Sequence, residues 1–397
     1  MSLSNQGSDQ RQDDSGSCHG CDALLVVTHL SPGGTREVLT LIAQELRARG
    51  LKVAIVALYR GHEADIHDFP CDIIVDRERL NARGYAKAFI QLTSRIKAMQ
   101  PAALLSFMPA ANIMGALSGV AVGVRRRIAT HHQPGWTQHP VLRTIDRVLG
   151  SLGVYSHVIA VSESIRTSFA AYPRGYRDRI CVIPNAIRPI APRNDRLAVR
   201  RHFGLRGDAV LVAAIGRLSP EKNLFNTLAG AARVAGIQLA LVGDGPLRDD
   251  IERYIAAAHL DGKVFLLGQV DHQVATDILF AADVFIQLST FEGRSLSLLE
   301  ALYAETTIVA SDIPSQREVL TMSDGSLAGL VCDPDDVNAI TAAISGVTTN
   351  DRLRRKLAAK ASILKRGLDS MQMGREYANL VTGARIAPNV VLSRGVV

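Results

Sequence analysis

Short apolar runs rich in β-branched residues alternate with amphipathic segments along almost the whole chain. The first run, Ala23 to Thr28, is followed by Arg36 to Arg49, where apolar side chains recur every three or four residues and Gly50 supplies a stop. Strands that alternate with helices in this way predict parallel sheets with helices on both faces. The pattern therefore predicts an α/β protein.

Strands are predicted in both halves of the chain. Those of the first half are Ala23 to Thr28, Leu51 to Ala57, Asp72 to Val75, Ala103 to Ser106, Arg127 to Thr130, His157 to Val161 and Ile180 to Ile183. Those of the second half are Val210 to Ile215, Gln238 to Val242, Val264 to Leu267, Val284 to Leu288, Thr307 to Ala310 and Gly329 to Cys332. A chain of 397 residues is too long for one hydrophobic core, so we predict two facing Rossmann-like, doubly wound domains.

The domain boundary is predicted near residue 190. The segment Ala186 to Asp208 contains two prolines and has no regular apolar period, so it is the expected connection. We predict a first domain at residues 22–190 and a second at 191–370. Residues 1–21 are polar and predicted to be a disordered tail, although Cys18 and Cys21 form an isolated C-x2-C. Residues 371–397 are predicted as a helix that returns toward the first domain, with a tail.

The cysteine content and the first apolar run indicate in which cellular compartment the protein is expected. Five cysteines are an odd and sparse count, which favours a reducing compartment. The first apolar run begins only at Ala23 and follows no basic leader, so no signal peptide is predicted. The uncharged stretch between Lys97 and Arg125 contains Pro101 and Pro109, so we predict a buried strand, loop and helix there. We expect a cytoplasmic protein.

The positive charge is concentrated in one hundred residues. Residues 101–200 hold 13 Arg and four acidic residues, whereas the rest of the chain has a small negative balance. Such a block could attract anionic lipid, nucleic acid or an acidic substrate, or it could be solvated helix surface. Aromatic residues make up only 5% of the chain and no DNA-binding motif is present, so no nucleic acid is expected.

Two loops after predicted strands are suited to binding phosphate. Gly33 and Gly34 precede a helix and allow a ligand to approach the backbone and the helix N-terminus. Gly216 begins a second loop, in which Arg217 and Lys222 flank a predicted helix start at Ser219 and Pro220. Two cations beside a helix N-terminus form an anion site, which a leaving phosphate needs. The alternative for both loops is an ordinary surface turn.

Two further loops offer weaker signals. Gly243 and Gly245 lie in a glycine-rich turn between a strand and a helix, where they could serve a ligand or only the turn. Val270 follows another strand, and its backbone could meet the edge of a nucleotide base.

The loop and helix from Ser289 to Glu300 carry the most informative pattern. Glu292 lies in the loop and Glu300 within the following helix, so the two carboxylates could bind the hydroxyls of two different sugar rings. Ser295 is a plausible N-cap, and the helix N-terminus formed with Leu296 and Ser297 would face a phosphate.

A histidine pair ends a predicted strand of the first domain. His131 and His132 follow Thr130, and a neutral imidazole there could donate to a substrate oxygen. A structural role is the common alternative for a loop histidine.

Taken together, the second half resembles the donor-binding half of the retaining glycosyltransferases of family 4. The resemblance rests on GRLSPEKN, LALVGDGPLRDDI, VFLLGQV, ILFAADVFIQLST and the E-x7-E motif from Glu292 to Glu300, which cover about 150 residues in the family's order. The first half is similar through PGGTREVL and ATHH. The resemblance implies the GT-B architecture of two facing Rossmann-like domains.

Roles for individual residues follow from the resemblance. It implies that Arg217 and Lys222 bind the donor diphosphate, that Glu292 binds the transferred sugar and that Glu300 binds the ribose. It places Gly33 and Gly34 near the phosphates. His131 would contact the donor sugar or the reacting centre, with His132 as the substitute. It implies no metal site and no cofactor besides the nucleoside diphosphate sugar.

The sequence departs from the family pattern at Arg294, Ser295 and Ser297, where an aromatic or aliphatic residue, a glycine and a proline are common. Ser295 could crowd a ligand that approaches the backbone. The predicted function is retaining transfer from a UDP- or GDP-sugar to a lipid-linked or polysaccharide-precursor acceptor, at an anionic membrane surface bound through residues 101–200. The alternatives are a sugar-nucleotide-binding module with little turnover and a nucleic-acid-binding protein with a basic face.

Overall fold

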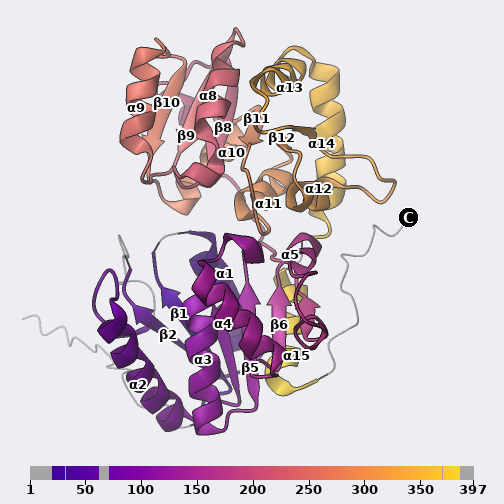
Figure 1. Cartoon of the computed structure of the whole chain (residues 1–397). Helices are drawn as coiled ribbons and strands as arrows, with labels where there is room; N and C mark the ends of the chain where they lie inside the picture. The colour runs from indigo at the N-terminus through magenta and orange to yellow at the C-terminus, as the bar shows by residue number, and fades with distance from the viewer. Residues whose placement is uncertain (1–19, 32, 62–70, 369, 385–397) are drawn as a thin grey trace, which may run out of the picture.

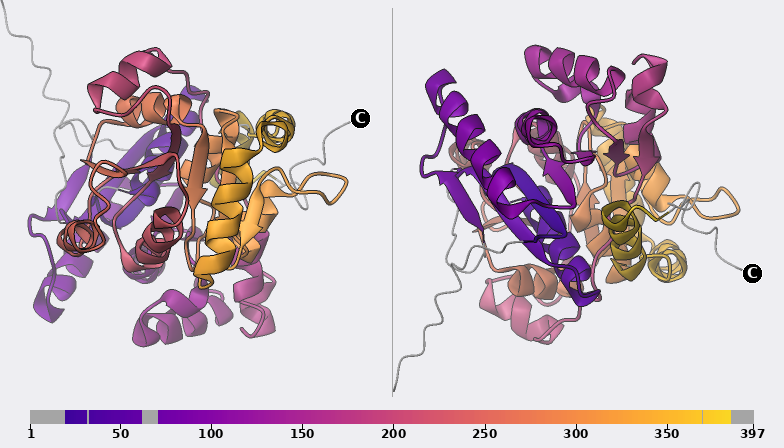
Figure 2. Two further views of the ribbon diagram at one scale, coloured as in Figure 1. Left: turned by 90° about the horizontal axis from the view of Figure 1, so that it is seen from above. Right: turned by 90° about the horizontal axis from the view of Figure 1, so that it is seen from below.

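The computed structural model describes residues 20–31, 33–61, 71–368 and 370–384. Residues 1–19 of the predicted tail, which was expected to span residues 1–21, and the end of the chain from residue 385 lie outside the described residues. The described chain forms two domains, each built on one parallel sheet, which Figure 1 shows one above the other. In the two views along that direction in Figure 2, one domain covers much of the other.

The first domain has a seven-stranded sheet in the order β3-β2-β1-β4-β5-β6-β7. Its strands are β1 (Ala23–His29), β2 (Val53–Tyr59), β3 (Asp72–Val75), β4 (Ala103–Phe107), β5 (Arg126–His131), β6 (His157–Ala160) and β7 (Ile180–Val182). Its helices are α1 (Gly34–Ala48), α2 (Ala82–Met99), α3 (Pro109–Val122), η1 (Gly135–Thr137), α4 (Pro140–Ser151), α5 (Glu163–Ser168) and α6 (Arg174–Arg177).

The second domain has a six-stranded sheet in the order β10-β9-β8-β11-β12-β13. Its strands are β8 (Val210–Ile215), β9 (Ile237–Val242), β10 (Val264–Gly268), β11 (Val284–Gln287), β12 (Thr307–Ser311) and β13 (Leu330–Cys332). The helices that follow β7 are α7 (Arg196–His202), η2 (Pro220–Lys222), α8 (Leu224–Ala232), α9 (Arg248–Ala257), α10 (His272–Ala281), α11 (Leu296–Tyr303), α12 (Pro314–Leu320), α13 (Val337–Thr349), α14 (Asp351–Lys365) and α15 (Ser370–Thr382).

Strand composition explains the layering. In β1 the residues from Ala23 to Val27 are all buried, because α2 and α3 cover one face of the sheet while α1 and α15 cover the other. Strands buried on both faces are expected in a doubly wound sheet. The prediction of two parallel α/β domains is confirmed.

The last helix does not stay with the second domain. Figure 1 shows α15, in yellow, beside the first domain, where it packs against α1. Arg126 stabilises its end by donating to the carbonyl oxygens of Val381 and Thr382, both at 3.0 Å. Cations at a helix C-terminus satisfy carbonyls that lack a helical partner.

Two local predictions were wrong, those for Cys21 and for the helix start at Ser219, and one short helix was not predicted. Cys21, assigned to the tail, is buried, and its Sγ lies 2.9 Å from the Ala23 carbonyl oxygen. The connection between the domains contains α7, which Asp195 caps by accepting from two backbone N–H groups. The helix expected at Ser219 and Pro220 is only the 3₁₀ turn η2, and α8 begins at Leu224 after the left-handed Asn223.

The apolar stretch from residue 98 to 124 folds as predicted, into the buried strand β4, a loop and α3. Among the described residues, no helix combines the length and apolar character needed to cross a bilayer.

Candidate active site

The strand order changes direction between β8 and β11, and both strands lead into loops with predicted site residues. Arg217 and Lys222 follow β8, and Glu292 follows β11. In doubly wound sheets, ligands bind outside the carboxyl ends of the strands at such a switch point. The topology therefore brings the two loops to the place where a ligand is expected.

Lys222 and Glu292 form the most compact contact of the site. The Lys222 Nζ lies 2.5 Å from the Glu292 Oε1, and both side chains are largely buried. The same oxygen accepts from the Ser289 hydroxyl at 2.7 Å and from the Gln287 amide at 3.3 Å. Three donors therefore hold the Glu292 carboxylate in one orientation.

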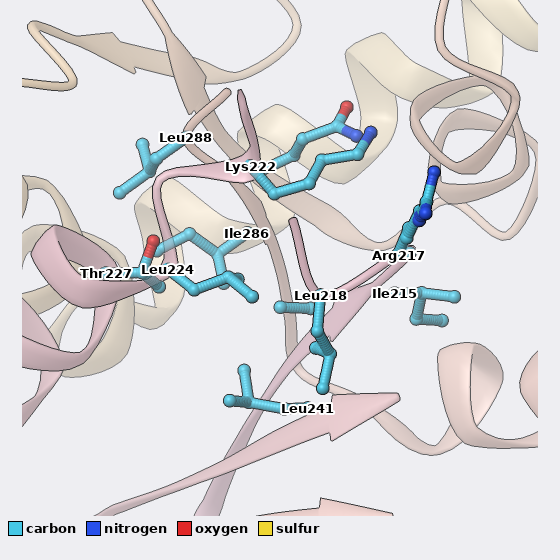
Figure 3. Close-up of a pocket in the computed structure, with 12 residues that line it drawn as sticks. Ile215, Arg217, Leu218, Lys222, Leu224, Thr227, Leu241, Ile286 and Leu288 are labelled. Carbon is cyan, nitrogen blue, oxygen red and sulfur yellow. The ribbon is translucent and has the colours of Figure 1, made fainter. Parts of the chain in front are cut away.

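Arg217 differs from Lys222 because it has no carboxylate partner among the described residues. It lies opposite the first domain, since its charge adds to burial in lowering the pKa of His29, at the end of β1. Figure 3 shows the charged ends of Arg217 and Lys222 at the rim of a pocket whose other labelled walls are mainly leucine and isoleucine. This guanidinium is available to an anion.

Glu300 lies farther along the same surface, in α11. Its Oε1 is 2.8 Å from the Nε2 of His272, the first residue of α10. This hydrogen bond and the Glu300 charge raise the pKa of His272 against the opposing effect of burial. Burial, with a further contribution from Glu300, raises the pKa of Glu37 in α1 of the first domain. Glu300 therefore also lies opposite the first domain.

The glycines after β8 and β9 allow two loops to pack backbone to backbone. A Cβ at Gly243 would lie 2.1 Å from the Gly216 carbonyl oxygen, and one at Gly245 would lie 2.5 Å from that of Leu218. All three glycines have positive φ angles. In the structure these glycines therefore allow the two loops to pack closely beside Arg217. Gly216 also lies against the Lys222 side chain.

The N-terminus of α11 faces the first glycine loop. A Cβ at Gly34 would lie 3.8 Å from Leu296 Cδ1, whereas nothing lies within 4 Å of the corresponding position at Gly33. Leu296 packs against the apolar cores of both domains. Ser295 caps α11 by accepting from the Leu298 N–H at 3.3 Å, and its hydroxyl also contacts that of Ser297 at 3.1 Å.

Gly293 is a residue whose importance the sequence did not indicate. A Cβ at this position would lie 1.9 Å from the His132 carbonyl oxygen, so only glycine allows the approach. Next to this contact the Ser162 hydroxyl donates to the Gly293 carbonyl at 2.9 Å, and the Trp136 and Phe291 rings meet at 5.3 Å. The E-x7-E loop therefore touches the first domain directly.

The prediction that His131 contacts the sugar is not supported by its position. His131 is buried, with Nδ1 at 3.1 Å from the Gln138 amide and Nε2 at 3.0 Å from the Tyr176 hydroxyl. Burial lowers its pKa, although the nearby Asp146 acts in the opposite direction. Both ring nitrogens are engaged within the first domain, which leaves His131 no free nitrogen for a ligand.

His132, the predicted substitute, has a ring nitrogen without a partner among the described residues, whereas both ring nitrogens of His131 are engaged. His132 is the first residue after β5, and its ring stacks on Phe107 at a centroid distance of 5.9 Å instead of joining the Tyr176 network. Its Nε2 is buried and has no hydrogen-bond partner among the described residues. Burial, and then His131, lower its pKa to about 4, so the ring is neutral. A neutral imidazole with a free nitrogen can donate to or accept from a ligand.

Arg294 points away from the Glu292 carboxylate. Its buried side chain donates from Nε to the Asn185 carbonyl oxygen at 2.9 Å and lies 3.8 Å from Glu318 of α12. The Glu318 carboxylate in turn accepts from the backbone N–H groups of Glu163 and Ser164, both at 3.0 Å. The departure from the family pattern at Arg294 thus contributes to contacts between the domains.

The remaining predictions concern Val270 and metals. Val270 is half-buried against the apolar cluster beside α10, two residues before His272. Among the described residues, no group of three or more His, Cys, Asp or Glu side chains is arranged to hold a metal ion.

His272 was missed because its sequence setting, the start of a predicted helix, is also that of many surface histidines. A signal was present, since it follows Val270 by two residues and the carboxylate that it binds was already selected. The contacts of Gln287 and Ser289 with Glu292 were also not predicted. Gln287 ends a strand and Ser289 lies in a loop, and neither position belongs to a recognisable motif.

Models of two glycosyltransferase families match the chain. The family described as glycosyl transferases group 1 matches residues 195–363, and glycosyltransferase family 4 matches residues 32–189.

Named relatives agree with these matches over part of the chain. A phosphatidyl-myo-inositol mannosyltransferase of Mycolicibacterium smegmatis is 33% identical over 190 residues, which are 47% of this chain and 44% of the relative. A 2-deoxystreptamine N-acetyl-D-glucosaminyltransferase of Streptomyces fradiae is 28% identical over 220 residues, which are 52% of this chain and 51% of the relative. The chain thus spans about half the length of these relatives.

Solved structures match the fold over nearly the whole chain. The Anabaena protein Alr3699/HepE, in complex with UDP and glucose, has a TM-score of 0.77 at 18% identity and covers 91% of this chain and 99% of its own. WaaG, a glycosyltransferase involved in lipopolysaccharide biosynthesis, has a TM-score of 0.73 at 15% identity, over 91% of this chain and 100% of its own. The expectation of a GT-B fold is confirmed, and the chain belongs to glycosyltransferase family 4.

Proposed function

We propose that the protein is a retaining glycosyltransferase that moves a hexose-type sugar from a UDP- or GDP-sugar to a lipid-linked or polysaccharide-precursor acceptor. The observation that carries the proposal is the 2.5 Å contact between Lys222 and Glu292. It joins a cation suited to a diphosphate and a carboxylate suited to sugar hydroxyls, from loops that follow adjacent strands. Arg217, without a carboxylate partner among the described residues, supplies a second cation beside them.

The chemistry follows from where charge develops. The bond between the anomeric carbon and the donor phosphate oxygen breaks while the acceptor oxygen bonds the same face of that carbon. The acceptor proton passes to the leaving phosphate, and Arg217 and Lys222 stabilise the charge that grows there. Glu292 holds the sugar hydroxyls, and Glu300 the ribose. His132 replaces His131 in this proposal as the neutral ring that contacts the donor sugar.

Relatives and neighbours support the substrate classes. Alr3699/HepE is described in complex with UDP and with UDP-glucose, which favours UDP as the nucleotide. One relative acts on phosphatidyl-myo-inositol by its name, and another, from Campylobacter jejuni, on a diphospho-undecaprenol-linked sugar. A membrane-linked acceptor fits the basic composition of residues 101–200, and we propose a cytoplasmic protein bound peripherally to the inner membrane face.

Donor choice and turnover can be tested together. We expect one class among UDP-, GDP- and ADP-sugars to raise the melting temperature of the purified protein, because a ligand bound to the native state stabilises it. The same donor should then be hydrolysed or transferred, with an axial anomeric linkage retained in the product by NMR. Stabilisation without any donor turnover would instead favour the sugar-nucleotide-binding module. No stabilisation by any donor would contradict the proposal.

A further inference from the structure

Many arginines of the basic segment are used inside the molecule. Arg126 binds the end of α15, and Arg127 donates to the Val154 carbonyl oxygen at 2.6 Å. Others pair with carboxylates or carbonyl groups, namely Arg166, Arg174, Arg179, Arg196 and Arg200. The excess charge of residues 101–200 therefore does not by itself define a binding surface.

Three neighbouring helices of the first domain define such a surface better. Helix α3 packs between α2 and α4, as Figure 1 shows in the lower domain. The three helices carry six Arg or Lys side chains, and their one carboxylate, that of Asp146, is buried. Arg95 pairs with Asp72, which leaves five cations without a carboxylate partner among the described residues, namely Arg83, Lys87, Lys97, Arg143 and Arg147. We call the outer side of α2, α3 and α4 the basic helical face.

Exposed aliphatic side chains accompany these cations. On α4 and its C-cap, the exposed fractions are 58% for Val141, 38% for Ile145, 49% for Val148 and 75% for Leu152. These residues are spaced by four, three and four positions, so they form one stripe along the helix. Leu117, Val120 and Ile90 are exposed on the neighbouring α3 and α2, at 36%, 50% and 67%.

We propose that the basic helical face docks on an anionic lipid bilayer. An amphipathic helix with an aliphatic stripe and flanking cations binds in the interfacial region, where aliphatic side chains enter the acyl boundary and cations meet the headgroups. A second copy of this chain is a poor occupant, because two such faces would bring five unpaired cations against five. Nucleic acid is a poor occupant as well, because the stripe is aliphatic and offers no ring for stacking.

The position of α4 connects this surface with the active site. The helix begins at Pro140, four residues after Trp136, whose ring contacts Phe291 in the E-x7-E loop. The stripe therefore extends from the region where the domains meet. The inference rests on the proposed function, since a lipid-linked acceptor held in the bilayer would then reach the donor site without leaving the membrane.

The test is co-sedimentation of the full chain with vesicles of phosphatidylcholine alone or with about one third phosphatidylglycerol, at low salt. We expect binding to the anionic vesicles only, weakened at least about tenfold by the double change Ile145→Asp and Val148→Asp. Replacing Lys87 and Arg143 by Gln should weaken binding about tenfold. Unchanged binding by both double variants would overturn the proposal.

Helix α14 provides matched controls. It carries an exposed Ile363 and the exposed Arg352 and Arg355, but no exposed apolar stripe. Ile363→Asp and Arg355→Gln should leave vesicle binding unchanged. Loss of binding in these variants to the same extent as in the α4 variants would show a nonspecific charge effect and overturn the assignment.

Further experiments distinguish a bilayer from nucleic acid and from a second copy of the chain. They also distinguish the docking proposal from the glycosyltransferase proposal. Displacement of the protein from vesicles by single-stranded RNA at equal phosphate concentration would assign the face to nucleic acid. A wild-type dimer that Ile145→Asp dissociates, together with no vesicle binding, would assign it to a second copy. Donor-induced thermal stabilisation should be the same in wild type and in the α4 variants. Failure of that stabilisation in wild type would instead count against the glycosyltransferase proposal.

Discussion

The two domains contribute different chemistry to the surface where they meet. The second domain presents charged side chains, with Lys222 and Glu292 paired and Arg217 without a carboxylate among the described residues. The first domain presents glycine backbone at Gly33 and Gly34 and the neutral ring of His132. Charged residues and glycine pairs can be selected from sequence, whereas the difference between the engaged ring of His131 and the free nitrogen of His132 requires the geometry.

The strongest test of this contrast removes the unpaired cation of the second domain. Arg217→Ala should lower kcat for sugar transfer by about 10² to 10³, because one charge contact to the leaving phosphate is lost. Steady-state rates at saturating donor measure the effect. The control is Arg253→Ala, which removes an exposed arginine on α9. Wild-type turnover in Arg217→Ala would contradict the proposed role.

Substitutions of the adjacent His131 and His132 test which of the two side chains of the first domain contributes to catalysis. His131→Ala should lower the free energy of unfolding by about 3 kcal/mol, because Gln138 and Tyr176 lose a buried partner. His132→Ala should instead lower kcat about tenfold, the value of one hydrogen bond to the sugar, with a smaller loss of stability. Denaturant unfolding and transfer rates distinguish the two. The opposite pattern would restore the catalytic role to His131.

The contact between the domains through Arg294 should have a smaller effect. Arg294→Met keeps much of the buried volume but removes the bond to Asn185, so we expect a loss of about 2 kcal/mol in unfolding free energy. Arg317→Met, which breaks the exposed pair with Asp312, should cost less than about 1 kcal/mol. Equal losses of unfolding free energy in the two variants would show that the buried contact stabilises the protein no more than the exposed pair does.

The buried ring of His132 makes stability depend on pH. Its pKa in the folded protein is about 4, below the 6.5 of an unfolded histidine, so the unfolded state takes up a proton first as pH falls. This contribution to stability is complete above pH 6.5 and is lost as pH falls toward 4, by on the order of 3 kcal/mol. His132→Phe should flatten the unfolding profile over this interval. An identical profile in the variant would refute this assignment.

The smallest expected effect concerns Glu300 and His272. The hydrogen bond to Glu300 raises the pKa of His272, so this pair stabilises the fold most at low pH and loses its charge as pH rises. A neutral His272 competes less for the carboxylate, and nucleotide binding should tighten a few-fold as pH rises above the usual histidine pKa of about 6.5. Calorimetric titration measures it, and His272→Gln should remove the dependence. A stronger slope in His272→Gln would exclude this explanation.

Element types were predictable because alternation of β-rich and amphipathic segments is a property of the sequence itself. The helix start at Ser219 was not, because its hydroxyl binds Glu221 at 2.6 Å instead of capping the helix. The choice between His131 and His132 was not predictable either. It depends on how each ring packs, since His131 ends β5 and contacts Gln138 and Tyr176, whereas His132 follows the strand and stacks on Phe107.

Gly293 fixes a dimension of the molecule. The backbone of Gly293 packs directly against the His132 carbonyl group. The separation of the domains at this point therefore does not depend on any side-chain rotamer. The width of the space beside Glu292 is therefore set by main-chain atoms. An added methyl group would act as a spacer that holds two intact domains apart, and would change how large a substrate fits between them while each domain's own fold stays as it is.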